Sequence, residues 1–235
     1  MNQKVNNFFD TWIVYDQILD HNYMFHNELF LDFQNYLKYY FKNEAITILD
    51  LGCGSARHIA SALAQFPVKN YVGYDLLSET ALNHARNNLV ALQCSFELIQ
   101  ADLLSGLKER NSAYDIVFSG FACHHLNETE KNQFFQMAYR CLKAKGVLVL
   151  IDVVRAENES LHVYLERYCN WLRSNWRAIS KEALEMACEH IIGNDFPDQI
   201  SDLFEKASAV GFQTSSQVSN YCQHAMLSFE KTMIQ

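Results

Sequence analysis

The sequence predicts an α/β fold built on a seven-stranded, mostly parallel, doubly wound sheet. From residue 44 onward, short apolar runs alternate with segments of helical periodicity, the pattern of a parallel sheet with crossover helices. Several of these runs end at or just before an aspartate. Aromatic-rich helical segments stand before the first run and after the fifth. We therefore expect an N-terminal helical cap at residues 1–43, a Rossmann-like domain at residues 44–235, and a helical lid insertion at residues 153–200.

Composition limits the classes of protein that fit this chain. Its 235 residues, 49% of them hydrophobic, are enough to bury a substantial core. A formal net charge of −8 argues against non-specific binding to nucleic acid or to an anionic membrane. The seven cysteines include no C-x-x-C pair, which favours reduced thiols. No apolar run has the length of a signal peptide or of a membrane span, roughly 18 residues, so we expect a cytoplasmic protein without nucleic-acid or membrane partners. The oligomeric state stays open.

Two amphipathic helices joined by residues 21–26 are predicted ahead of the first strand. Apolar residues recur at helical spacing in both of them. They are Phe8, Trp12, Tyr15 and Leu19 in the first helix, and Phe30, Phe33, Leu37 and Tyr40 in the second. One interpretation is that both helices only cover a face of the sheet. The other is that Tyr15, Tyr23 and His26 overhang a ligand site as a cap.

The first strand and the turn after it, residues 46–57, form the best-defined motif. An apolar run ends in Asp50 and is followed by Gly52 and Gly54, then by a helix from Arg57 to about residue 65. Because glycine has no Cβ, the backbone can turn sharply there and lie against a ligand. Asp50, at the carboxyl end of the strand, is positioned below whatever binds above the turn.

This motif resembles the first motif of the class I S-adenosylmethionine-dependent methyltransferases, an acidic residue followed by G-x-G-x-G. The last glycine of that pattern is Ala56 in this chain. A dinucleotide-binding G-x-G-x-x-G turn would need a small residue where the chain has Arg57, which disfavours a nicotinamide-dependent oxidoreductase.

The second and third strands are predicted at residues 70–75 and 96–100. Asp75 closes the second strand about 20 residues beyond Gly54, the spacing at which an acid reaches ribose hydroxyls. A helix is expected at about residues 78–92, with Ser78 as its N-cap. The resemblance implies that Asp102, just after the third strand, accepts a hydrogen bond from the adenine amino group.

The fourth strand, residues 114–119, leads into Gly-Phe-Ala-Cys-His-His-Leu, which resembles the fourth motif of the same family. The nucleobase-methylating motifs [DN]-P-P-[YF] and Pro-Cys are absent from the chain, which counts against a nucleobase substrate. A helix at 128–142, a turn at 143–146, a strand at 147–152, a helix at 199–210 and closing strands near 212–218 and 221–229 complete the predicted sheet.

The resemblance implies a cofactor site for S-adenosylmethionine at the strand ends. Its predicted residues are Tyr15, His26, Asp50, Gly52, Cys53, Gly54, Arg57, Asp75, Leu76, Asp102, Leu103 and Ser119. The predicted substrate-binding residues are Tyr23, Arg155 and Trp176, for a small, partly apolar molecule with an acidic group.

A general base, where one is needed, is predicted among His124, His125 and His190, because imidazole titrates near neutrality. No metal site is expected, since the His124–His125 pair lacks the spaced carboxylates or cysteines of metal-binding sequences. The predicted function is methyl transfer to a small metabolite. Two alternatives are a cofactor-binding subunit that activates a partner enzyme, and another reaction of the same cofactor, such as formation of a modified sulfonium.

Overall fold

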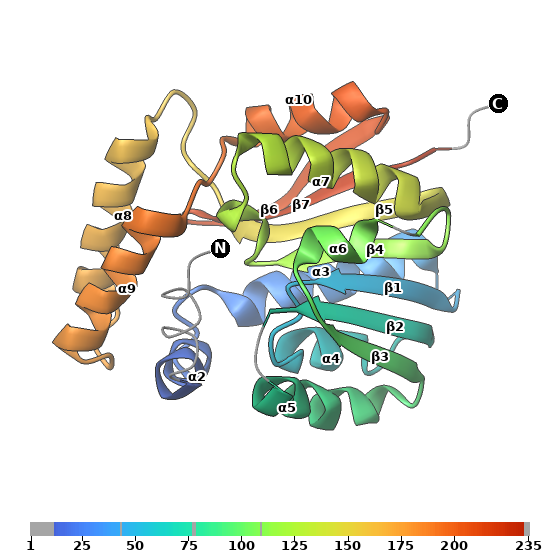
Figure 1. Ribbon diagram of the computed structural model, residues 1–235, viewed down its shortest axis with the longest axis horizontal. Helices are drawn as coiled ribbons and strands as arrows, with labels where there is room; N and C mark the ends of the chain where they lie inside the picture. The colour runs from blue at the N-terminus through green and yellow to red at the C-terminus, as the bar shows by residue number, and fades with distance from the viewer. Residues whose placement is uncertain (1–11, 43, 77–78, 109, 233–235) are drawn as a thin grey trace.

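The computed structural model describes residues 12–42, 44–76, 79–108 and 110–232, and its centre is one seven-stranded sheet (Figure 1). The strand order is β3-β2-β1-β4-β5-β7-β6, with β7 antiparallel to both of its neighbours and the other pairs parallel. The strands are β1 (Ile46–Leu51), β2 (Val68–Asp75), β3 (Ser95–Gln100), β4 (Tyr114–Gly120), β5 (Leu142–Val153), β6 (Thr214–Tyr221) and β7 (His224–Glu230). The predicted fold class is confirmed.

Helices cover both faces of the sheet (Figure 1). The helical segments are α2 (Trp12–Asp20), α3 (His26–Phe41), α4 (Arg57–Leu63), α5 (Glu79–Leu89), η1 (Val90–Leu92), α6 (Leu103–Leu107), η2 (Cys123–His125), α7 (Glu128–Cys141), α8 (Leu161–Asn175), α9 (Lys181–Asn194) and α10 (Ile200–Val210). One buried cluster joins α3, α4 and α5 to the sheet, and another joins α6, α7 and α10 to its opposite face. The central strands are buried on both sides, which explains their nearly continuous apolar runs.

The apolar residues of α3 pack against the sheet. Leu29, Phe33 and Leu37 are fully buried in the cluster that contains the inner residues of β1 and β4. For the second predicted helix, this agrees with the interpretation that the N-terminal helices cover a face of the sheet. Phe8 lies outside the described residues, as does the predicted N-cap Ser78.

Helices α8 and α9 form a hairpin beside the sheet, and α2 lies next to them (Figure 1). Ile18 of α2 is buried in the same cluster as the inner residues of the hairpin. After α2, the ring of Tyr23 stacks on Trp176 with 5.4 Å between centroids. The two segments predicted as a lid are therefore in contact with each other, although their action as a lid remains a prediction.

Some predicted strand boundaries differ from the structure. β5 begins at Leu142, whereas the sequence predicted a turn at 143–146 and a strand only from residue 147. The predicted turn is present as an irregularity in the pairing of β4 with β5, where Lys145 has a positive φ of 65°. The last two strands, β6 and β7, lie further toward the C-terminus than predicted. The turn between them contains Cys222, which also has a positive φ.

Candidate functional site

A pocket opens around the glycine turn between β1 and α4, and we call it the glycine-turn pocket. It encloses about 390 Å³, including the part open to solvent, and its walls come from α2, α3, α4 and the ends of β1 and β4. The predicted cofactor-binding residues that line it are Tyr15, His26, Asp50, Gly52, Cys53, Gly54 and Arg57. Phe30, Phe118 and Phe121 also line it and were not predicted as site residues.

The backbone of the turn shows why its residues must be small. Gly52 has a φ of 82°, and a Cβ there would lie 2.4 Å from the Cβ of Ala122. Gly54 also has a positive φ, and its N–H donates a 2.8 Å hydrogen bond to the Asp75 carboxylate. Ala56 adopts the left-handed conformation as well, at φ 53°, where the family pattern has its last glycine. The turn thus keeps its geometry despite the missing glycine.

Asp50 supplies a buried carboxylate to the glycine-turn pocket. The side chain is 1% exposed, and it accepts a hydrogen bond from the hydroxyl of Tyr71. Its other oxygen, Oδ1, is buried without a hydrogen-bond partner among the described residues. Burial raises the pKa of Asp50 to about 7, against the opposing effect of the Tyr71 hydrogen bond, and the charge of Asp75 adds to the rise. Such a carboxylate suits a cationic or hydrogen-bond-donating ligand.

Helix α2 approaches the turn from outside the sheet. The hydroxyl oxygen of Tyr15 is 3.7 Å from the position that a Cβ on Gly54 would take. Burial, together with the charge of Asp75, raises the pKa of the Tyr15 hydroxyl above its ordinary value. Arg57 at the start of α4 forms a 2.8 Å ion pair with Asp20 at the end of α2. Both side chains of this pair are about half exposed, so the pair contributes little stability, about 1 kcal/mol at most.

The other predicted cofactor-binding residues are not among the described residues that line the glycine-turn pocket. Ser119 is buried and donates its hydroxyl to the carbonyl of Leu51. Asp102 is the N-cap of α6 and accepts a 3.0 Å hydrogen bond from the N–H of Ser105. Leu76 is exposed, and Leu103 begins α6. Asp75 accepts the N–H of Gly54, and the cofactor roles of all five residues stay predictions.

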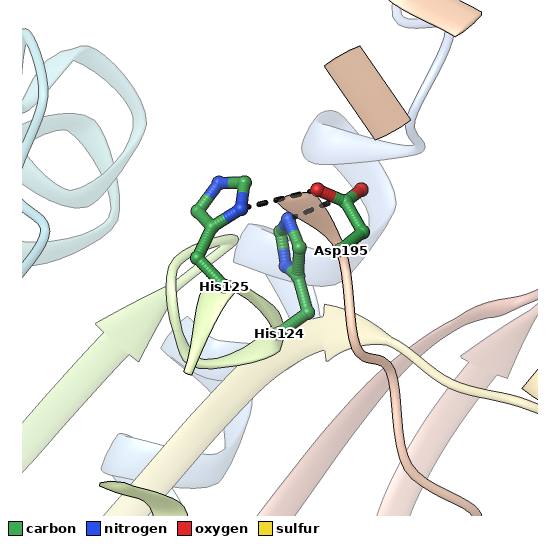
Figure 2. A group of neighbouring side chains, drawn as sticks. All are labelled: His124, His125 and Asp195. Carbon is green, nitrogen blue, oxygen red and sulfur yellow. Dashed lines mark ion pairs between the residues drawn. The ribbon is translucent and has the colours of Figure 1, made fainter. Parts of the chain in front are cut away.

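A second group of side chains lies just beyond β4, and we call it the histidine cluster: His124, His125, His190, Asp152 and Asp195. Figure 2 shows His124, His125 and Asp195. His124 Nδ1 lies 2.5 Å from Asp152 Oδ1, and His124 Nε2 lies 3.7 Å from Asp195 Oδ2. His125 Nδ1 lies 3.1 Å from Asp195 Oδ1. The ring of His190 on α9 stands edge-on to His125, with 5.7 Å between centroids. The structure thus brings together all three histidines predicted as catalytic.

Charges within the histidine cluster shift its pKa values. Burial works against a charged His124, but Asp152 and Asp195 outweigh it and raise the pKa of His124. Burial likewise opposes ionisation of Asp195, yet His124 and His125 hold its pKa below the ordinary value. Burial lowers the pKa of His190, which favours its neutral form near pH 7.

The loop after α9 carries Asp195 to the histidines. The N–H of Phe196 donates a 2.7 Å hydrogen bond to the carbonyl of His124. Lys131 of α7, buried to 1% exposure, contacts the carbonyl of Phe196 and forms a 3.0 Å ion pair with Asp198. These contacts fix the loop on η2 and keep the Asp195 carboxylate over the histidine pair.

The predicted substrate-binding residues lie away from the glycine-turn pocket, in the packing of the α8–α9 hairpin and its flanking loops. The hydroxyl of Tyr23 accepts a 2.8 Å hydrogen bond from the N–H of Ala178, and Trp176 is 3% exposed. Arg155 donates to the carbonyl of Pro197 and lies 3.7 Å from a carboxylate oxygen of Asp202. Their substrate contacts stay predictions.

Sequence reasoning missed the two acidic members of the histidine cluster. Asp152 closes the fifth strand just as Asp50 and Asp75 close the first two, and this repeated position was the available signal. Asp195 had no such signal, because it reaches His124 only through the folding of the loop after α9.

Comparison with known families identifies the domain that carries the glycine-turn pocket. Residues 48–146 match the family described as "Methyltransferase domain". The matched segment holds the glycine turn, Asp75 and the His124–His125 pair. Residues 48–146 therefore form a methyltransferase domain, and the match supports a class I S-adenosylmethionine-dependent methyltransferase. S-adenosylmethionine is accordingly the cofactor of this domain.

Curated relatives and solved structures resemble this chain over half of its length or more. Cyclopropane mycolic acid synthase 1 of Mycobacterium tuberculosis is 30% identical over 117 residues, 50% of this chain and 39% of that protein. Cyclopropane mycolic acid synthase MmaA2 of the same species is 26% identical over 172 residues, 71% of this chain and 54% of that protein. These alignments therefore span about half or less of each relative's length.

A chain from a Haloferax volcanii complex that contains the Trm112 methyltransferase activator has the same fold. It aligns with a TM-score of 0.65 at 14% identity, over 96% of this chain and 98% of its own. In the described part of the chain, no helix combines the length and the apolar character needed to cross a membrane.

Proposed function

We propose that this methyltransferase transfers the methyl group of S-adenosylmethionine to a small-molecule acceptor. The main support for this proposal is that the glycine-turn pocket and the histidine cluster are close together along the chain. Gly120 at the end of β4 and Phe121 after it line the glycine-turn pocket, and the histidine cluster begins at His124, three residues after Phe121. This proximity supports a cofactor site and a proton acceptor at the same end of the sheet.

The residues of the glycine-turn pocket fit the cofactor. The buried Oδ1 of Asp50 has no hydrogen-bond partner among the described residues and offers an acceptor to the ammonium of the methionine part. The turn at Gly52 leaves no room for a side chain, so a ligand can lie against the backbone. The side chains of Tyr15 and His26 stand over the same pocket.

When bound, S-adenosylmethionine supplies a methyl group already activated by its sulfonium. The chain then has to orient the acceptor, exclude water and accept a proton where the acceptor carries one. We assign proton acceptance to the histidines of this cluster, a role that stays with His190 where His124 and His125 bind another group, and exclusion of water to α2 and the α8–α9 hairpin. Tyr23, Arg155 and Trp176 remain the proposed contacts for the acceptor.

The names of the curated relatives favour a second candidate. Both are cyclopropane mycolic acid synthases, so transfer of a carbon unit to a lipid chain is the alternative reaction of the same cofactor. The Haloferax volcanii complex adds the alternative of a chain that works with an activating partner.

The test is methyl transfer by the purified chain. We expect it to bind S-adenosylmethionine but not NAD in calorimetry, and to move a labelled methyl group into the small-molecule fraction of a metabolite extract, followed by mass spectrometry. Label in the lipid fraction would favour the second candidate. Binding of the cofactor without any transfer, unless a partner protein is added, would favour the activated or subunit role.

A further inference from the structure

We propose that the histidine cluster is a metal site that binds a transition-metal dication of the Zn²⁺ type through His124 Nε2, His125 Nδ1 and a carboxylate oxygen of Asp195. The three side chains converge from η2 and from the loop after α9 (Figure 2). Two imidazoles and one carboxylate form a donor set that zinc takes in catalytic sites, with a further position left for water or substrate. Mg²⁺ and Ca²⁺ prefer sites made of oxygen ligands.

The spacing of the donor atoms suits coordination. Bonds of about 2.1 Å at a tetrahedral angle place two ligand atoms about 3.4 Å apart. Oxygens of Asp195 lie 3.1 Å from His125 Nδ1 and 3.7 Å from His124 Nε2, on either side of this value. All three ligand atoms lie within 4.8 Å of one another. A cation can therefore bind between them after small movements of the side chains.

The carboxylate of Asp152 orients the first ligand as in known zinc sites. It stands 2.5 Å from Nδ1 of His124 and also accepts the N–H of that residue, so Nε2 is directed at Asp195. A carboxylate on the far nitrogen of a metal-binding histidine is the usual second partner in such sites, where it fixes the tautomer and raises the basicity of the ligand.

The charges around the histidine cluster also favour a dication. Asp152 and Asp195 are 4% and 5% exposed, and every ion pair that the described residues give them is to a histidine. The buried Lys131 is instead paired with Asp198. Among the described residues, histidines alone balance the charge of these two carboxylates, and a dication bound at the imidazoles would balance it in their place.

The first measurement is binding of the metal alone to the chelator-treated full chain, with no cofactor or acceptor present. We expect one Zn²⁺ per chain by calorimetry, competition by Co²⁺ with the visible absorption of an ordered nitrogen and oxygen site, and no heat with Mg²⁺. Asp195→Asn and His125→Gln should each weaken Zn²⁺ binding at least tenfold. Asp152→Asn should weaken it about 10–100-fold, the range for loss of a carboxylate behind a ligating histidine.

His162→Gln is the matched control, because this histidine is exposed and forms its ion pair with Glu166 of its own helix. It should bind Zn²⁺ as the wild type does. Equal Zn²⁺ affinity in wild type, Asp195→Asn and His125→Gln would overturn the proposal, as would no binding at all. If a variant fails to fold, anomalous diffraction at the zinc edge from wild-type crystals decides: a peak between His124, His125 and Asp195 supports the site, and a peak elsewhere or none refutes it. Neither readout depends on methyl transfer.

Discussion

At the scale of single residues, Asp50 gives the glycine-turn pocket a pH dependence. Its pKa is raised to about 7, so below that pH the free protein carries a protonated Asp50. A cationic ligand group at Oδ1 favours the carboxylate form, and binding must then release the proton. We expect affinity for S-adenosylmethionine to be constant above about pH 8 and to fall toward tenfold per pH unit below about pH 6, measured by calorimetry.

Asp50→Asn is the control for this pH dependence. The amide keeps an acceptor for the Tyr71 hydroxyl but cannot ionise. The variant should bind more weakly at pH 8, by about 10–150-fold for a lost charged hydrogen bond of 1.5–3 kcal/mol, and its affinity should not change with pH. The same slope in the variant as in the wild type would assign the linked proton to another group.

Two glycine-to-alanine substitutions should have opposite effects on stability. Gly52→Ala places a Cβ 2.4 Å from Ala122 at a positive φ, so we expect the free energy of unfolding to drop by about 2–4 kcal/mol. Gly193→Ala in α9 meets no atom within 4 Å and should stabilise the protein by up to about 1 kcal/mol. Urea denaturation of both variants checks the pair. A neutral Gly52→Ala would show that Ala122 and the turn relax easily.

Several residue roles were readable from the sequence and others were not. The aspartates at the strand ends and the glycine pair predicted the glycine-turn pocket. Both features can be read from residue type and from spacing along the chain. The left-handed backbone at Ala56 was hidden, since the residue type there does not demand it. The partner of Arg57 was hidden too, because Asp20 is brought to it by the packing of α2.

At the scale of elements, the buried Lys131 controls the position of the loop after α9. It bonds the carbonyl of Phe196 and pairs with Asp198, to which Lys206 also lies close at 3.4 Å. Lys131→Met should lower the free energy of unfolding by about 3 kcal/mol, the low end for a broken buried pair, because Lys206 still faces Asp198. Urea denaturation measures the loss.

Lys143→Met is the matched substitution at a partly exposed pair. Lys143 lies 2.8 Å from Asp115 and its side chain is 38% exposed, so its loss should cost about 1 kcal/mol or less. Equal losses in the two lysine variants would mean that burial of Lys131 does not set the strength of its contacts.

Element positions were predictable where periodicity is strong. The alternation of strands and helices predicted the sheet, and the positions of α7 and α10, because those patterns are local. The start of β5 was wrong, since Gly146 signals a turn while the pairing with β4 extends the strand through an irregularity. No local signal indicates that the loop after α9 lies on η2.

At the scale of the whole molecule, α2 and the α8–α9 hairpin form one layer over the end of the sheet that carries the glycine-turn pocket (Figure 1). If they close the site, their amides should exchange more slowly when S-adenosylmethionine is bound. At a ligand concentration one hundred times the dissociation constant, binding adds about 2.7 kcal/mol, so exchange that requires release of the ligand should slow by up to about 100-fold.

Hydrogen exchange followed by mass spectrometry can separate this role from simple shielding of the sheet. Peptides from α2 and from the turn at residues 21–25 should gain protection with cofactor, and peptides from α10, on the opposite side of the sheet from α3, should not change. Tyr15→Phe removes only a hydroxyl, which lies near Gly54, and should reduce the protection of α2 without lowering the melting temperature. If α2 exchanges equally with and without cofactor while the glycine turn becomes protected, then α2 serves the architecture of the fold and does not close the site.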